Sequence, residues 1–82
     1  MKKLNIIYED KEILVVNKPA KLLTVATYKE EIRTLYHEVR EYLHKKNQKV
    51  FVVHRLDKDT SGLVLFAKNP RLKEMLQNNW LR

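Results

Sequence analysis

The chain has 82 residues, and its 17 Lys and Arg against 10 Asp and Glu give a formal net charge of +7. The length predicts one compact unit and excludes a second domain. Because a chain this short buries only about 60–65% of its unfolded surface, its stability is expected to be marginal. The absence of cysteine excludes disulfide bridges and zinc knuckles.

The first two predicted elements are short strands over residues 5–9 and 12–17, joined by a tight hairpin at Asp10-Lys11. Lys18-Pro19 ends the second strand, because proline cannot donate to a strand ladder. Residues 21–26 are then expected to form a short extended segment or a loop.

An amphipathic helix is predicted over residues 32–46, and Asn47 is a plausible stop. Its apolar side is formed by Ile32, Leu35, Tyr36, Val39 and Leu43. The start of this helix has two interpretations, since Thr27 with Glu30 fits a capping box and Thr34 could cap a later start. His37 and His44 lie on this helix without a partner pattern, which favours exposure to solvent.

Two continuous apolar runs, at residues 50–53 and 62–67, are typical of interior strands buried on both faces. The polar stretch between them is predicted to be a loop at the edge of the sheet. Asn69 as N-cap and Pro70 as the first helical residue then begin a second helix over 70–82. Its inner face would carry Leu72, Met75, Leu76 and Trp80.

The predicted fold is therefore α+β, with a mixed, mostly antiparallel sheet and flanking helices. The second helix has no C-cap signal, and one glycine is far below the roughly 7% of an average chain. Both features indicate an incomplete fold. The longest uncharged apolar runs are also far below the roughly 18 residues that a membrane span needs, so we expect a cytoplasmic protein without a membrane partner.

Positive charge gathers in the second half of the chain. Residues 1–41 hold eight Lys and Arg against seven Asp and Glu, whereas residues 42–82 hold nine against three. A field of this sign attracts phosphate backbones, although by itself it does not distinguish nucleic acid from an acidic protein or a membrane surface.

The densest polar cluster is the loop from His54 to Gly62, between the two most apolar strands. Asp57 lies between Arg55 and Lys58, which favour its charged form, and an ionised carboxylate can act as a nucleophile or a general base. Spacing alone leaves open that Asp57 and Asp59 are only turn residues. It also leaves open a Mg²⁺ site built from these two aspartates and His54, although such sites usually recruit carboxylates from several elements.

The sequence HRLDKDTSGLVLFAK at residues 54–68 resembles the signature of the RluA-type RNA pseudouridine synthases, written HRLDxxTSGLLLxAK. Near the start, Ile7-Tyr8-Glu9-Asp10 and ILVVNKPA at residues 13–20 are similar to the opening strands of the family and to its KPaG motif. The resemblance extends from Asn5 to about Trp80. One departure is Lys21, which stands where the family usually has glycine, so this turn must avoid positive φ or accept strain.

The resemblance implies an isomerase that detaches uracil from ribose C1′ in rRNA or tRNA, rotates it and rejoins it through C5. Asp57 would be the catalytic residue, by attack at C1′, by attack at C6 or by removal of the C2′ proton. No cofactor or metal is implied, because uracil is a tolerable leaving group that stays in the pocket.

The other motif positions have supporting roles in this interpretation. Arg55 would bind the substrate by holding a phosphate, pairing with the aspartate or filling the gap left by a flipped uridine. His54 is expected to be a structural, hydrogen-bonded group, and Lys18 belongs to a chiefly structural Lys-Pro step. Support of the loop is expected from Asp59, Thr60, Ser61 and Gly62.

Residues 1–82 are then expected to be the N-terminal portion of a truncated catalytic domain, without the S4-type domain that many relatives carry. The family's later tyrosine and further basic residue are absent from the sequence, so we expect the 82 residues alone to be inactive or nearly so. The alternative function is a non-catalytic RNA-binding module. Exposed sheet edges predict self-association of such a fragment.

Overall fold

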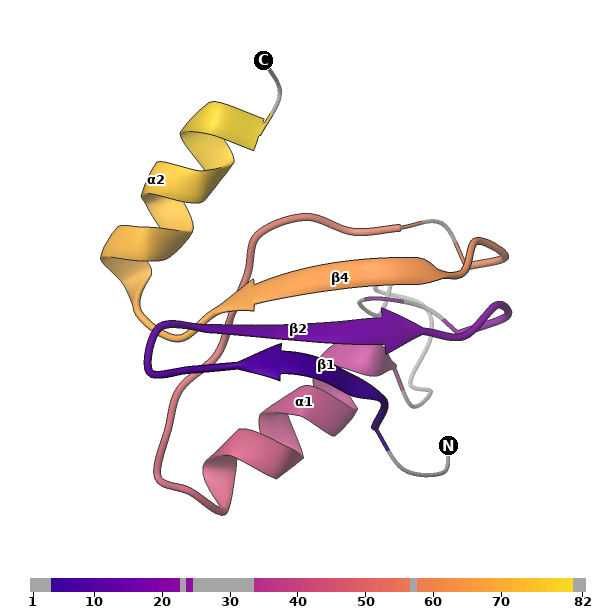
Figure 1. Cartoon of the computed structure of the whole chain (residues 1–82), viewed down its shortest axis with the longest axis horizontal. Helices are drawn as coiled ribbons and strands as arrows, with labels where there is room; N and C mark the ends of the chain where they lie inside the picture. Colours follow the sequence, from indigo (N-terminus) through magenta and orange to yellow (C-terminus); the bar gives the residue numbers. More distant parts are fainter. Residues whose placement is uncertain (1–3, 23, 25–33, 57, 81–82) are drawn as a thin grey trace.

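The computed structural model describes residues 4–22, 24, 34–56 and 58–80 of the chain. The described elements are the strands β1 (Ile6–Glu9), β2 (Ile13–Lys18), β3 (Phe51–Val52) and β4 (Gly62–Ala67), and the helices α1 (Leu35–His44) and α2 (Pro70–Trp80). The four strands form one sheet in the order β1-β2-β4-β3, and every pairing in it is antiparallel (Figure 1). The predicted α+β fold with a mostly antiparallel sheet is confirmed.

The hairpin between β1 and β2 turns at Asp10, as the sequence predicts. Its carboxylate Oδ1 accepts hydrogen bonds from the backbone N–H groups of Glu12 and Ile13, at 2.8 and 2.9 Å. These bonds lower the pKa of Asp10, because they stabilise the charged carboxylate. The turn is therefore specified locally by an aspartate that caps its own loop.

The core lies between α1 and one face of the sheet. The alternation of a strand sends Leu14 and Val16 of β2, and Val64 and Phe66 of β4, to the same side. The helical spacing of α1 brings its apolar stripe against them. All seven core side chains are fully buried: Leu14, Val16, Leu35, Val39, Leu43, Val64 and Phe66.

Helix α1 is shorter than its pattern predicts. Thr34 is its N-cap, and the Thr34 hydroxyl accepts a hydrogen bond from the backbone N–H of His37 at 3.0 Å. The later of the two possible starts is therefore the observed one, and Thr27 and Glu30 lie outside the described residues. A helix from Ile32 is wrong, because the extended backbone of Thr34 (φ −124°, ψ 168°) marks the boundary.

The other end of α1 is also earlier than expected, at His44 instead of Lys46. Asn47 adopts a left-handed φ of 62°, and the N–H groups of Asn47 and Gln48 donate to the carbonyls of His44 and Leu43. This pair of bonds is the Schellman motif, which satisfies the last carbonyls of a helix. Asn47 is the stop that the sequence indicated.

The run at residues 50–53 is not an interior strand, and this prediction is wrong. Only Phe51 and Val52 pair with β4, and both are half-buried at the edge of the sheet. The ladder stops there because Val53 and the following residues leave the sheet to enter the loop. Strand β4 is central, but Leu63 on its other face is 58% exposed, so it is not buried on both faces either.

Helix α2 begins as predicted, since the Asn69 side chain accepts from the backbone N–H of Leu72 at 2.7 Å. The helix leaves the end of β4 and extends away from the sheet (Figure 1). Leu72 and Leu76 are half-buried, whereas Met75 is 52% exposed and so does not share a buried face with them. Residues 81–82 lie outside the described part.

Ionic contacts tie the far end of the sheet to α1. Glu9 accepts from the ammonium groups of Lys68 and Lys46, at 2.8 and 3.3 Å, and from the Tyr42 hydroxyl at 2.6 Å. Burial by itself would raise the pKa of Glu9, but hydrogen bonds from Lys68, Tyr42 and Lys46 outweigh it and lower the pKa to about 2. Lys68, the last residue of the motif at 54–68, thus forms an ion pair with Glu9 at this end of the sheet.

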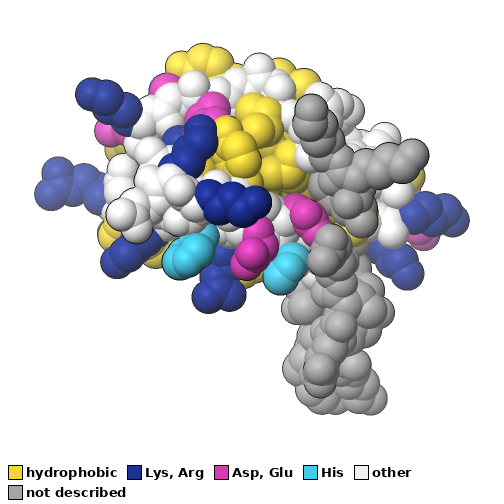
Figure 2. All heavy atoms as spheres, turned by 90° about the horizontal axis from the view of Figure 1, so that it is seen from below, with side chains coloured by type: hydrophobic (Ala, Val, Ile, Leu, Met, Phe, Trp, Pro, Cys, Tyr) yellow, Lys and Arg dark blue, Asp and Glu magenta, His cyan; other side chains and the backbone are white. Residues whose placement is uncertain are grey.

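Figure 2 views the molecule from the side that α1 occupies. Lys and Arg side chains project around the margin of this face, and hydrophobic side chains gather between them. No helix among the described residues is long and apolar enough to cross a membrane.

Candidate active site

The polar loop between β3 and β4 contains the HRLD motif. Asp57, the predicted catalytic residue, lies outside the described residues, so the site is built from its flanks, 54–56 and 58–61. Arg55 is exposed and Leu56 is half-buried. The flanks therefore combine one side chain that solvent and a substrate can reach with one that anchors the loop.

Thr24 fixes the residue just before Asp57. Its hydroxyl donates to the Leu56 carbonyl at 3.0 Å and accepts from the Leu56 backbone N–H at 3.1 Å. Thr24 is almost fully buried, and its own carbonyl accepts from the N–H of Tyr36 in the first turn of α1. One threonine therefore connects the loop to the start of the helix.

Lys18 and Lys21 fix the residue just after Asp57. The Lys58 carbonyl accepts from the Lys18 ammonium at 3.0 Å and from the Lys21 backbone N–H at 2.7 Å. The same ammonium donates to the carbonyls of Pro19 at 3.1 Å and Leu22 at 2.5 Å. Lys18 is fully buried, and these carbonyl dipoles contribute to the stabilisation of its charge.

The backbone of Lys21 is strained, which is one of the two outcomes expected at this position. Its φ is 73°, in the left-handed region that favours glycine. The hydrogen bond from its N–H to the Lys58 carbonyl holds this conformation. The turn thus keeps a glycine-like backbone with a lysine side chain, which lies exposed 3.9 Å from the Asp59 carboxylate.

His54 has a backbone-pairing role. Its Nε2 accepts a hydrogen bond from the backbone N–H of Leu65 at 3.1 Å, beyond the last β3–β4 pair. The bond requires an unprotonated Nε2, and burial lowers the pKa of His54, which also favours the neutral ring. The imidazole therefore continues the ladder where the backbone of β3 has turned away.

Gly62 begins β4 with a φ of 148°, which side chains rarely adopt. A Cβ at this position would lie 3.4 Å from Leu56 Cδ1. Asp59, Thr60 and Ser61 are exposed. The hydrogen bonds described above that hold Leu56 and Lys58 come from Thr24, Lys18 and Lys21, for which the sequence indicated no role in the loop.

Two of these missed anchors had a weak signal in the sequence. Lys18 follows Leu14 and Val16 at strand spacing, so it falls on the buried face of β2. Thr24 is the lone polar residue in the run Leu22–Val25. Neither pattern indicates which group, 32 or 40 residues away, is the hydrogen-bond partner.

The described residues contain no group of three His, Cys, Asp or Glu that could hold a metal ion. The arrangement can instead hold a short loop by its two ends in a basic environment. Hydrogen bonds to both flanks of a loop are the kind of support that a positioned functional group needs.

Comparison with known proteins identifies the family to which this fold belongs. The family model described as RNA pseudouridylate synthase matches residues 12–82. The dual-specificity RNA pseudouridine synthase RluA of Vibrio vulnificus is 42% identical over 92% of this chain and 29% of its own length. The tRNA pseudouridine synthase C of Haemophilus ducreyi is 35% identical over 94% of this chain and 31% of its own length.

A solved structure agrees with these matches. Human RNA pseudouridylate synthase domain containing 4 is similar with a TM-score of 0.74 and 25% identity, over 93% of this chain and 29% of that protein. The chain spans between about a fifth and a third of the length of the curated relatives that it matches. Motif, fold and these matches agree, and the chain belongs to the RNA pseudouridylate synthase family, in its RluA-type branch.

Proposed function

We propose that this chain supplies the part of an RNA pseudouridine synthase active site that carries the aspartate, with Asp57 as the catalytic residue and rRNA or tRNA as the substrate. The observation that carries the proposal is the loop with both flanks of Asp57 hydrogen-bonded, at Leu56 by Thr24 and at Lys58 by Lys18. Membership of the family supports it. The reaction breaks the N1–C1′ bond of a uridine and forms a C5–C1′ bond, while C5 loses a proton and N1 gains one.

Asp57 would act as an ionised carboxylate between two cationic residues. Attack at C1′ would displace uracil and trap the anomeric carbon, in the manner of a retaining glycosidase. Attack at C6 or removal of the C2′ proton uses the same carboxylate. Arg55, exposed two residues earlier, is suited to a phosphate of the flipped nucleotide.

Tritium release from RNA labelled at uridine C5 tests this proposal. It is measured in the longest natural protein that contains these residues and then in the 82 residues alone. We expect robust release by the former, loss of release in Asp57→Asn, and near-normal release in Asp59→Asn, a matched change on an exposed carboxylate of the same loop. Release by Asp57→Asn at the normal rate would contradict the assignment, and loss of activity in EDTA would favour the Mg²⁺ alternative.

Residues 1–82 alone are proposed to be inactive, as the N-terminal portion of a larger catalytic domain. The support is that the chain spans about a fifth to a third of its relatives' length. The isolated piece would then behave as a non-catalytic RNA-binding module in the cytoplasm. Robust tritium release by the 82 residues would overturn this part of the proposal.

Self-association of the isolated chain is proposed through the side of the sheet that faces away from α1. Leu63 and Tyr8 are 58% and 51% exposed, and Tyr8 pairs in register with Val15 on this side. A second copy would cover these apolar groups. Sedimentation velocity tests this: a monomer at all concentrations up to about 1 mM would contradict it.

A further inference from the structure

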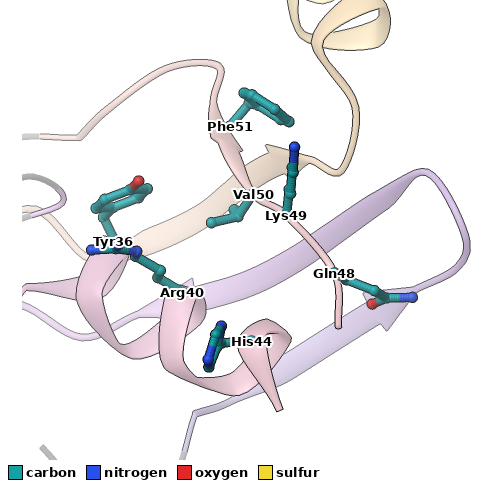
Figure 3. Close-up of a pocket in the computed structure, with 7 residues that line it drawn as sticks. All are labelled: Tyr36, Arg40, His44, Gln48, Lys49, Val50 and Phe51. Atoms are coloured by element: carbon teal, nitrogen blue, oxygen red, sulfur yellow. The ribbon is translucent and has the colours of Figure 1, made fainter. Parts of the chain in front are cut away.

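A hollow lies apart from the HRLD loop, between α1 and the segment that leads into β3. It encloses about 290 Å³ and is lined by Tyr36, Arg40, His44, Gln48, Lys49, Val50 and Phe51. Figure 3 shows that three of these residues come from successive turns of α1 and that the others follow one another along the segment from α1 to β3. The volume is near the lower end of the range for small-molecule sites, which suits a single nucleotide.

The polar lining carries the positive charges of Arg40 and Lys49. Arg40, His44 and Lys49 are exposed, and no carboxylate of the described residues lines the hollow. The carboxylates of α1 lie elsewhere, since Glu38 and Glu41 line a different hollow beside β1. Arg40 therefore lines one hollow and the two glutamates of the same helix line another, so the hollow beside β3 is complementary to an anion.

The remaining lining suits a base and a sugar. Tyr36 and Phe51 are half-buried, so both residues are partly accessible, and Val50 lies between α1 and β3 in the close-up (Figure 3). Aromatic rings interleaved with Arg and Lys form the usual platform for single-stranded RNA, where bases stack and phosphates pair with cations. The Gln48 amide adds a group that can donate or accept at a base edge.

We propose that this hollow binds one nucleotide of the single-stranded RNA that flanks the target uridine, with Arg40 and Lys49 on phosphates and Phe51 or Tyr36 against the base. The proposal rests on the proposed function for its RNA substrate. Phe51 precedes Arg55 by four residues, so the two Cα atoms are at most about 14 Å apart. RNA held in the hollow can therefore continue toward the HRLD loop.

Binding of a fluorescein-labelled 12-nucleotide single-stranded RNA to the 82-residue chain, followed by anisotropy over a salt series, tests the proposal. Each cation removed from a phosphate of single-stranded RNA reduces the slope of log K against log salt by about 0.7. We expect Arg40→Ala and Lys49→Ala each to reduce the slope by this amount, and the double variant to bind about tenfold more weakly. Phe51→Leu is expected to weaken binding by a factor of about five or more and to leave the slope unchanged.

The matched control is the double variant Lys11→Ala, Lys45→Ala, which removes the same charge from the hairpin and from the other hollow. It should change the affinity less than twofold. Equal losses of affinity in control and test variants would overturn the proposal in favour of diffuse attraction by net charge. Displacement of the RNA by polyglutamate at equal charge would overturn it in favour of an acidic protein surface.

Binding and catalysis remain separable in these measurements. Binding is measured in the 82-residue chain, and tritium release is measured in the longer natural protein that contains it. Tritium release that fails while the slopes change as expected would count against the proposed function alone. Slopes that do not change while release proceeds would count against the second site alone.

Discussion

Thr24 gives the sharpest test of how the loop is held, through the isosteric variant Thr24→Val. Valine keeps the β-branched shape of the buried side chain but removes the hydroxyl that donates to and accepts from Leu56. The loss of two hydrogen bonds, at about 1 kcal/mol each, predicts a free energy of unfolding lower by about 2 kcal/mol. For a chain of 82 residues, whose total stability is on the order of 4–12 kcal/mol, this is a large share.

Urea unfolding followed by circular dichroism measures this change, with the m-value as a check that the two-state description holds. Thr24→Ser is the matched variant, because it keeps both hydrogen bonds and loses only a methyl group, at about 1 kcal/mol. Thr60→Val is the exposed control and should lie within about 0.5 kcal/mol of the unaltered chain. A Thr24→Val protein as stable as the unaltered chain would refute the anchoring argument.

Four further predictions concern the charged and polar groups described above. The pKa of about 2 for Glu9 in the folded chain lies below its ordinary value of 4.5. The stability from its ion pairs with Lys68 and Lys46 is therefore fully present above about pH 4.5 and is lost as the pH falls toward 2. Acid titration of the Glu9→Gln variant should lack this loss. The lowered pKa of His54 means that the unfolded chain binds its proton first, so stability should decline as the pH falls below about 6.5, and a flat unfolding profile there would contradict it. Lys21→Gly should raise the free energy of unfolding by up to about 1 kcal/mol, because it relieves a left-handed φ, whereas Lys21→Val should lower it, and urea unfolding of both variants measures the two changes. In the same assay Lys18→Met should lower the free energy of unfolding by about 3 kcal/mol or more, since three hydrogen bonds from a buried ammonium are lost and Lys58 keeps only the bond from the Lys21 N–H. A value under about 1 kcal/mol would contradict this.

The local elements could be predicted because their causes are local. The Asp10 turn, the Asn69 cap and the Asn47 stop each act within a few residues, and each is present as expected. The predicted second strand ends one residue later than expected, at Lys18, and the boundaries of α1 differ by two or three residues. Thr34 sets the start of the helix as its N-cap, and the Schellman bonds of Asn47 and Gln48 set its end.

The arrangement of the sheet could not be predicted in the same way. Continuous apolar runs were interpreted as strands buried on both faces, but this holds only where layers cover both sides of a sheet. Here α1 covers one face, so Leu63 of the central strand is exposed and the run at 50–53 supplies only a two-residue edge strand. Apolar content alone does not indicate which face has a partner.

The sequence by itself determined the family and the position of its signature motif, because a contiguous block such as residues 54–68 is recognised from its residue types alone. Only the tertiary structure decided what holds that block in place. Lys18 reaches the loop across 40 residues and Thr24 across 32. Such contacts form because a buried polar group needs a hydrogen-bond partner. The sequence shows that Lys18 and Thr24 need such partners, but only the packing of distant segments decides which groups they are.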